Sequence, residues 1–428
     1  MIRLFSLCCA ILLPVFAWAE GDLSEPSAFV VMNAESGRVL LQRAAHKKMY
    51  PASTTKVATA LYVLKTPGLD LNQKLVVPQD AVKSVSTAER AKDNYSKHAS
   101  YILETGASSL AGLKVGEVIT VQDALYGALL CSGNDAANVL AYYWGKGSIE
   151  ACVEGINRYV ESLGCVNTKF FNPHGLHHPQ HMSTAYDLAL IARQGMALPS
   201  FRRIVGSKSY TKERTNKQQP VTWQQTNKLL IPGSAFCGQA TGIKTGYFSL
   251  SKQCLIASGE NKDRSLIAVL LGCPDRKKMF QTAKSLLERF LSEEQVHRVV
   301  VEKGPLKLNR EVEGQPEALP LTAQDSSTVA FYPSEEPQIR AVAEWRELSF
   351  PVEEGQEVGV LRVLVDEREV DRVPLLASER RELTWPQRLL ICQKFLCGHQ
   401  WGVFAVSVLI VLFGFYLRKN FTKRRRPQ

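Results

Sequence analysis

Ser53 and Lys56 have the residue types and the spacing of an activated nucleophile. They lie three positions apart, just before the apolar stretch from Val57 to Leu64, whose pattern predicts a helix with one apolar face. Residues three apart share a helix face, so the serine hydroxyl and the lysine amine can meet. A serine is a weak nucleophile at neutral pH and needs a nearby base. A lysine can be that base when burial lowers its pKa, because desolvation disfavours the ammonium form.

The S-x-x-K spacing alone is a weak signal. It occurs again at Ser209 and Ser249, where a solvent-facing pair is the ordinary explanation. Only Ser53 stands at the start of a strongly apolar helix, where a buried lysine is unfavourable unless it has a function. The N-terminus of that helix also favours negative charge on the serine.

Two further polar groups follow along the chain. Ser132-Gly133-Asn134 lies between a helix predicted to begin at Thr120 and another that passes through Val139, and by itself it is typical of a turn between helices. Lys244-Thr245-Gly246 lies on a predicted strand, where a glycine lets a ligand or a second backbone approach closely. Taken alone, it is better explained as a turn at a strand edge.

The elements around these groups mix strand and helix patterns. Residues 27–42 and 253–271 each predict a hairpin, because apolar runs flank a polar turn that contains glycine. Residues 277–294 predict an amphipathic helix, and residues 83–105 are polar and predict an exposed excursion. After about residue 296, strand-like segments separated by glycine, proline and charged turns predict a small all-β domain.

Both ends of the chain differ from its body. Arg3, an apolar run to Phe16 and the small residues Ala17 and Ala19 predict a secretory signal peptide rather than a buried helix. Trp401 to Leu417 carries no charge and is at the lower limit of what spans a bilayer. Six basic residues follow it, which favours a C-terminal anchor with a cytoplasmic tail over an interfacial helix.

The predicted order is a signal peptide (1–19), a catalytic domain (20–295), a small all-β domain (296–380), a connector (381–400), a transmembrane anchor (401–417) and a basic tail (418–428). Without Arg3 and the six basic tail residues, the formal net charge falls from +11 to +4. Such a small excess gives no support for nucleic-acid binding.

Six cysteines lie in the body of the chain, and their wide spacing leaves disulfides and buried free thiols equally open.

The three polar groups together resemble the penicillin-interacting serine enzymes. Ser53-x-x-Lys56, Ser132-x-Asn134 and Lys244-Thr245-Gly246 occur in the order of that family, 79 and 112 residues apart. Pro51-Ala52 before the nucleophile and Gly242-Ile243 before the lysine triplet are similar to the D-alanyl-D-alanine carboxypeptidase branch, low-molecular-mass penicillin-binding proteins. The resemblance covers residues 25–295, and the β-domain resembles the C-terminal domain of that branch.

This resemblance implies a fold. The catalytic domain would be of the β-lactamase/transpeptidase-like α/β (α+β) class, with an antiparallel sheet and a helical subdomain. A small all-β domain and one C-terminal transmembrane helix would follow.

The resemblance also implies the catalytic roles. Ser53 would attack the carbonyl between two D-alanines while Lys56 accepts its proton, and Ser132 would help to relay a proton to the leaving amine. The backbone N–H groups of Ser53 and Tyr247 would hold the oxyanion, a kind of contact that contributes strongly to catalysis. Family members often carry histidine where this chain has Tyr247, so the backbone role is expected to persist while pH dependence and substrate preference are left open.

Substrate binding is assigned by the same resemblance. Asn134 would hold the substrate amide, and Lys244 and Thr245, in the triplet that Gly246 completes, would engage the terminal carboxylate. Arg264 is a further candidate for that carboxylate, with a plain surface arginine as the alternative. The expected partners are peptidoglycan stem peptides ending in D-Ala-D-Ala, β-lactams as inhibitors, and the membrane. No cofactor, metal or nucleic acid is expected, and the catalytic domain is expected on the periplasmic side of the bacterial inner membrane.

Four other functions compete with this one. Histidines at 174, 177, 178 and 181 raise the possibility of a zinc site, but Pro173, Gly175 and Pro179 interrupt any helical spacing and no carboxylate lies in that window. A β-lactamase needs a glutamate base for deacylation, and none with its flanking pattern lies between Ser132 and Lys244. A D,D-endopeptidase of the same family and an idle penicillin-binding scaffold both stay open, although the intact motifs argue against an idle scaffold.

Overall fold

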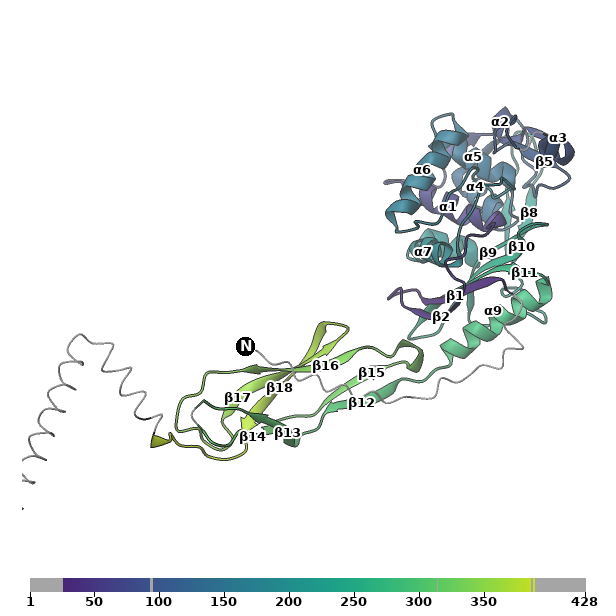
Figure 1. Cartoon of the computed structure of the whole chain (residues 1–428). Coiled ribbons are helices and arrows are strands. Elements are labelled where there is room, and N and C mark those ends of the chain that lie inside the picture. The colour runs from purple at the N-terminus through teal and green to yellow at the C-terminus, as the bar shows by residue number, and fades with distance from the viewer. Residues whose placement is uncertain (1–25, 93–94, 314, 386–387, 389–428) are drawn as a thin grey trace, which may run out of the picture. The chain divides into compact units, whose positions relative to one another are not determined.

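A five-stranded antiparallel sheet forms the centre of the N-terminal unit (Figure 1). The structure, a computed structural model, describes residues 26–92, 95–313, 315–385 and 388, and it divides into two compact units, one ending at Glu293 and one beginning at Glu294. In spatial order the strands are β2 (Val39–Arg43), β1 (Ala28–Asn33), β11 (Ser265–Cys273), β10 (Lys252–Glu260) and β9 (Ala240–Phe248). Both predicted hairpins are confirmed, as β1–β2 and β10–β11.

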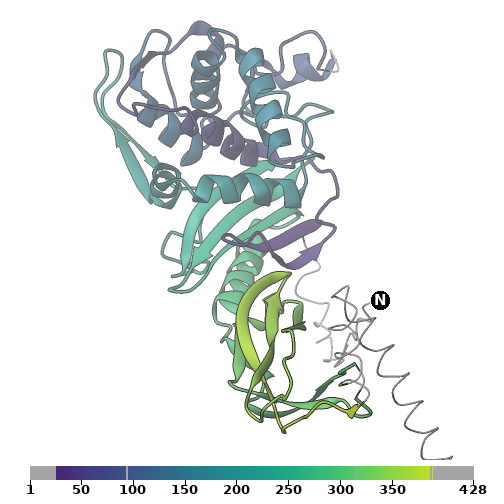
Figure 2. The ribbon, with the colours of Figure 1, turned by 90° about the vertical axis from the view of Figure 1, so that its left-hand side faces the viewer.

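This sheet is buried on both faces, which explains its continuous apolar strands. On β11, Ile267 and Val269 join the core on the helical side, while Leu266 and Leu270 join the core on the opposite side. Helix α9 (Arg276–Leu291) covers that opposite face, which confirms the amphipathic helix predicted over residues 277–294. The helical part and α9 therefore lie on opposite sides of one sheet (Figures 1 and 2).

Helix α1 (Lys56–Leu64) runs through the middle of the helical part. It packs against the helices α4 (Val121–Leu129), α5 (Asn134–Trp144), α6 (Ile149–Ser162), α7 (Ala185–Met196) and α8 (Pro199–Gly206). Seven of its nine residues are buried, and the small side chains of Ala58 and Ala60 allow neighbours on every side. The predicted start at Thr120 is confirmed by a capping box, in which the Thr120 and Asp123 side chains each accept the other's backbone N–H.

Short elements complete the unit. They are α2 (Gln79–Val82), α3 (Thr87–Lys92) and the small two-stranded sheets β3 (Lys74–Val76) with β6 (Val118–Thr120), β4 (Ser84–Ser86) with β5 (Leu103–Thr105), and β7 (Ser209–Lys212) with β8 (Val221–Gln224). Buried Lys212 donates to Glu117 and thereby ties the β7–β8 hairpin to the loop before β6.

The described part of the C-terminal unit is all-β, as its strand-like segments and intervening turns predict. The strands β13 (Gly304–Arg310), β14 (Leu319–Ala323), β18 (Arg368–Ala377), β17 (Glu357–Val365) and β16 (Ile339–Trp345) form one sheet in that order, and β12 (Val296–Val301) pairs with β15 (Ser327–Phe331). Alternate residues such as Leu319, Leu321 and Ala323 fill its core.

The two ends of the chain are not among the described residues. The predicted signal peptide, the transmembrane anchor at 401–417, the basic tail and most of the connector lie outside them. Among the residues that are described, no helix has the length and apolarity needed to cross a membrane.

Candidate active site

Ser53 lies in a short 3-10 turn, Ala52–Thr55, that leads directly into α1. The residue before it, Ala52, has φ +50°, a left-handed conformation that is uncommon outside glycine and occurs at functional turns. Gly175 fits against this turn, because a Cβ on it would lie 1.8 Å from the Ala52 carbonyl oxygen. The turn that presents the serine is therefore held by a segment more than a hundred residues away in sequence.

The amine of Lys56 is fully buried and makes three hydrogen bonds. Its Nζ lies 3.0 Å from Ser53 Oγ, 2.7 Å from Asn134 Oδ1 and 2.8 Å from the carbonyl oxygen of His174. Burial holds the pKa of Lys56 well below its usual value, and the positive charge of Lys244 lowers it further. The predicted pairing of Ser53 with a buried lysine is present in the structure.

The segment 131–135 brings Asn134, a member of the second polar group, to Lys56. Ser132 is buried with φ +66°, and Asn134 begins α5. Asp135 fixes this segment, because its carboxylate accepts the N–H groups of Ala111, Gly112 and Leu113. Asn134 thus reaches Lys56 from a helix start that a buried carboxylate holds in place.

The thiol pKa of Cys131, next to Ser132, is affected by the charges of both lysines. Burial raises the pKa of its thiol to about 11, while the charges of Lys244 and Lys56 oppose that rise. No disulfide joins any of the six cysteines of the described residues.

Lys244 and Thr245 lie on β9, one of the two edge strands of the central sheet in the described part of the chain. Lys244 is fully buried, its Nζ donates to the Thr245 carbonyl at 2.8 Å, and burial lowers its pKa to about 7. The Thr245 hydroxyl lies 2.8 Å from that of Thr226. Lys244 of this third polar group is close enough to lower the pKa of Lys56.

Gly246 permits a close contact between β9 and the nucleophile turn. A Cβ at this position would lie 2.9 Å from the Ser53 backbone nitrogen and 3.1 Å from the Pro51 carbonyl oxygen. The next residue, Tyr247, leaves 60% of its side chain exposed. The glycine thus brings the Ser53 N–H and the backbone at Tyr247 beside each other, where an oxyanion site was predicted.

A cleft of about 380 Å³ opens above these residues. Ser53, Asn134 and Tyr247 line it, together with Glu104 from the 83–105 segment and His177 from the loop after α6. The cleft is large enough for a short peptide end.

Arg264 does not join this site, so its prediction as a carboxylate ligand is wrong. It follows the β10–β11 turn, at the far end of β10 from the residues that pair with Lys244 and Gly246. Its side chain is buried, and Nη1 donates to the Phe290 carbonyl at 2.7 Å and to Glu293 at 3.1 Å. Arg264 instead ties the sheet to the C-terminal end of α9.

The prediction that residues 83–105 form an exposed excursion is also wrong in part. It contains β4, α3 and β5, and Arg90 and Glu104 are almost fully buried with Nε and Oε1 3.7 Å apart. Burial raises the pKa of Glu104, and Arg90 opposes that rise. Two opposite charges within one polar segment can be buried together as an ion pair, which polarity alone does not reveal.

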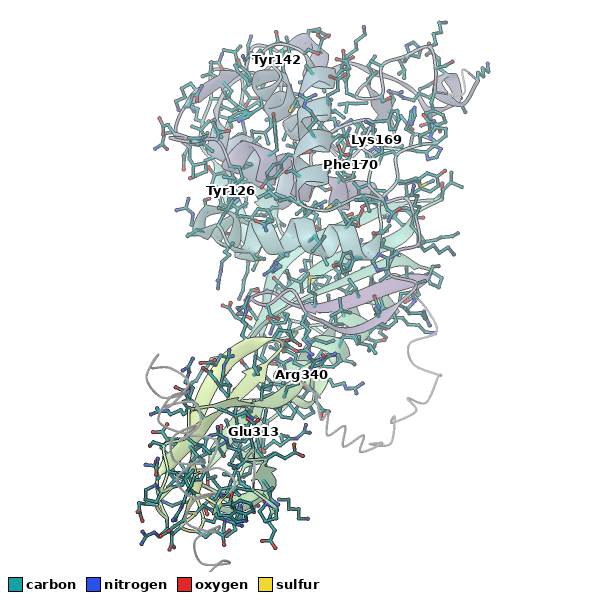
Figure 3. All side chains as sticks on the ribbon, turned by 60° about the vertical axis from the view of Figure 1, so that its left-hand side comes forward. Tyr126, Tyr142, Lys169, Phe170, Glu313 and Arg340 are labelled. Carbon is teal, nitrogen blue, oxygen red and sulfur yellow. The ribbon has the colours of Figure 1, made fainter. Side chains whose placement is uncertain are left out.

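The histidines near position 175 have structural contacts. His181 Nε2 lies 2.9 Å from Thr55 Oγ1, and its ring packs beside that of Phe170. Phe170 is labelled in Figure 3. His174 Nε2 lies 3.0 Å from the Tyr101 carbonyl. Within the described part of the chain, no three His, Cys, Asp or Glu residues are arranged to hold a metal. Two contacts were not predicted from the sequence: the bond from Lys56 to the His174 carbonyl, and the packing of Gly175 against Ala52. The loop at residues 172–176 was the only feature of the sequence that pointed to them.

Comparisons with known proteins agree with this geometry. Residues 19–275 match the family described as D-alanyl-D-alanine carboxypeptidase, and residues 297–382 match the C-terminal domain of penicillin-binding protein 5. The D-alanyl-D-alanine carboxypeptidase DacD of Escherichia coli is 30% identical over 82% of this chain and 86% of its own length. DacF of Bacillus subtilis is 27% identical over 83% of this chain and 85% of its own.

Solved structures are similar as well. Penicillin-binding protein 6B of Escherichia coli aligns with a TM-score of 0.57 at 26% identity, covering 82% of this chain and 95% of that one. The Streptomyces K15 DD-transpeptidase aligns with a TM-score of 0.52 at 28% identity, over 62% of this chain and 96% of that one. The chain belongs to the D-alanyl-D-alanine carboxypeptidase family.

Proposed function

We propose that this chain is a serine-type D-alanyl-D-alanine carboxypeptidase that removes the terminal D-alanine from peptidoglycan stem peptides and is inhibited by penicillin. The observation that carries the proposal is the buried Lys56 amine 3.0 Å from the Oγ of Ser53, a residue that lines an open cleft. Family membership and relatives that bear this name support it.

Acylation begins at Ser53. Its Oγ bonds to the carbonyl carbon of the penultimate D-alanine while neutral Lys56 takes the hydroxyl proton. The C–N bond then breaks, and the proton passes through Lys56 and Ser132 to the amine of the departing D-alanine. Water later attacks the ester, which releases the shortened peptide and returns the proton to Ser53. The Ser53 and Tyr247 N–H groups stabilise the oxyanion of both steps.

Asn134, Lys244 and Thr245 orient the peptide. Asn134, held at Lys56, offers its amide to the substrate backbone. Lys244 and Thr245 receive the terminal carboxylate, and the lysine must be charged to do so. This demand for a free carboxylate next to the scissile bond favours removal of one terminal residue.

Mass spectrometry of a pentapeptide ending in D-Ala-D-Ala, incubated with the full-length chain in detergent, tests the proposal. Loss of one alanine from the pentapeptide, absent with Ser53→Ala, is the expected result. Cleavage only of cross-linked peptide dimers would point instead to the endopeptidase. Labelling by penicillin without any turnover of peptide would indicate an idle scaffold.

We further propose that the chain is exported and anchored, with its catalytic unit on the periplasmic side of the bacterial inner membrane. The signal pattern at 1–19, the uncharged stretch 401–417 and the basic tail support this topology. A chain ending at residue 398 is expected to leave the membrane fraction and keep its acylation rate. Retention of that truncated chain in washed membranes would contradict the anchor.

A further inference from the structure

Strand β16 forms an edge of the five-stranded sheet in the C-terminal unit (Figure 1). Within the described residues it pairs with β17 alone. Ala341, Val342 and Trp345 are exposed along it, with 46% of Val342 and 42% of Trp345 accessible. An open, partly apolar edge strand without proline is a template for another strand, because its outer N–H and C=O groups have no ladder partner.

The hydrogen bonds to β17 show which backbone groups face outward. Gln338 and Arg346, just outside the two ends of β16, bond to Asp366 and Val358 on the β17 side. Backbone groups alternate sides along a strand, so even-numbered residues face β17. The N–H and C=O groups of Ile339, Ala341, Ala343 and Trp345 therefore point to the open edge.

The sequence of β16, Ile-Arg-Ala-Val-Ala-Glu-Trp, is charge-complementary to itself when reversed. If a second β16 lies antiparallel with Val342 opposite Val342, Arg340 faces Glu344 and Glu344 faces Arg340. In the same register Ala341 faces Ala343, and Ile339 faces Trp345. Opposite charges and apolar residues across two strands both stabilise pairing.

Backbone and side-chain patterns agree on this one register. The outward-facing residues 339, 341, 343 and 345 would form hydrogen-bonded pairs with 345, 343, 341 and 339 of the second copy. Arg340, Val342 and Glu344 would then occupy the non-hydrogen-bonded positions, where opposing side chains are closest. A shift by one residue would move the charges out of register and onto opposite faces.

From these observations we propose that β16 is a self-association surface, on which two copies of this chain join their sheets antiparallel about a two-fold axis at Val342. Arg340, labelled in Figure 3, now lies 2.8 Å from Glu367, and Glu344 lies 3.8 Å from Arg362. These are exposed ion pairs of little net stability, so they can exchange or be shared when a second copy arrives. The resulting assembly carries two catalytic units.

Cysteine cross-linking of the full-length chain in detergent tests the position of the axis. Non-hydrogen-bonded partners have Cα atoms about 4.5 Å apart, which a disulfide can bridge. In a background with Cys392→Ser and Cys397→Ser, Val342→Cys is expected to form disulfide-linked dimers under mild oxidation. Val370→Cys, on β18 and 54% exposed, is the matched control and should stay monomeric. Equal cross-linking of both variants, or none at Val342→Cys, would overturn the proposal.

Charge reversal tests the register. Arg340→Glu alone and Glu344→Arg alone each place like charges opposite one another twice, and each should raise the dimer dissociation constant at least about five-fold. A mixture of the two variants restores both opposite-charge pairs, so sedimentation velocity should show heterodimers as tight as wild-type dimers. This rescue separates pairing from damage to the fold. The register would be refuted if both single variants dimerised as tightly as the wild type, or if the mixture dimerised no more tightly than each variant alone. A wild-type chain that pulls down only unrelated proteins would assign the edge to another partner.

Discussion

The Nζ of Lys56 lies 3.0 Å from the Oγ of Ser53, one helical turn away. The same amine is 2.7 Å from Asn134 Oδ1, so one buried group connects the first two motifs. A lysine in this place is useful as a base only if it is neutral, and burial together with Lys244 lowers its pKa in that direction.

Lys56→Arg should fold but acylate at least about a hundredfold more slowly, since general-base catalysis contributes roughly 10²–10⁴ in rate. Arginine keeps the charge and cannot give up its proton. The rate of acylation by a chromogenic penicillin measures the effect, and circular dichroism checks the fold. Lys244→Arg, which keeps its electrostatic role, should lose less. An acylation rate near normal in Lys56→Arg would assign the base to another residue.

The pH profile should depend on two lysines with opposite requirements. Lys56 must lose its proton to act as base, so kcat/KM for a D-Ala-D-Ala peptide rises with pH on the acid side. Lys244 must stay charged to hold the carboxylate, and its pKa is about 7, so kcat/KM falls as pH rises above that value. Steady-state rates measured from about pH 5 to about pH 10 record both limbs.

Lys244→Arg distinguishes the source of the alkaline limb. Arginine remains charged throughout this range, so the decline above neutral pH should disappear while the acid limb stays in place. If the alkaline decline persists unchanged in that variant, a different group controls carboxylate binding.

Gly246→Ala should impair acylation by about tenfold or more, because its Cβ would lie 2.9 Å from the Ser53 nitrogen and push the nucleophile turn from β9. Such overpacking typically lowers the free energy of unfolding by about 1–3 kcal/mol. Gly238→Ala is the matched control, since nothing lies within 4 Å of its added Cβ. Penicillin acylation and urea unfolding of both variants measure the contrast. Full activity in Gly246→Ala would mean that the close approach is unimportant.

Arg264→Met should leave kcat/KM within about twofold of the wild type while lowering the free energy of unfolding. The change removes the donor to the Phe290 carbonyl at 2.7 Å, and loss of one partner of a buried hydrogen bond costs about 1–3 kcal/mol. Denaturant unfolding together with peptide kinetics separates the two effects. A raised KM with unchanged stability would instead return Arg264 to carboxylate recognition.

The sequence by itself determined the local parts of this protein. The apolar pattern after Ser53 specified α1, Thr120 and Asp123 specified the start of α4, and alternating residues specified the strands of the C-terminal unit. Such features depend on neighbours within a few positions, where periodicity and capping chemistry act directly. The three motifs could be found for the same reason, because each is contiguous or spans one helical turn.

Only the tertiary structure decided what these parts contact. Lys56 finds its third partner in the carbonyl of His174, 118 residues later, and Gly246 is required because β9 passes against the Ser53 turn. Arg264 was misplaced because a charged residue after a hairpin has no local signal for the helix end on which it docks. Arg90 and Glu104 were expected in solvent, since polarity along the chain does not show that two opposite charges can be buried together. Contacts between distant segments follow from how the sheet and the helices pack, and no local pattern encodes that packing.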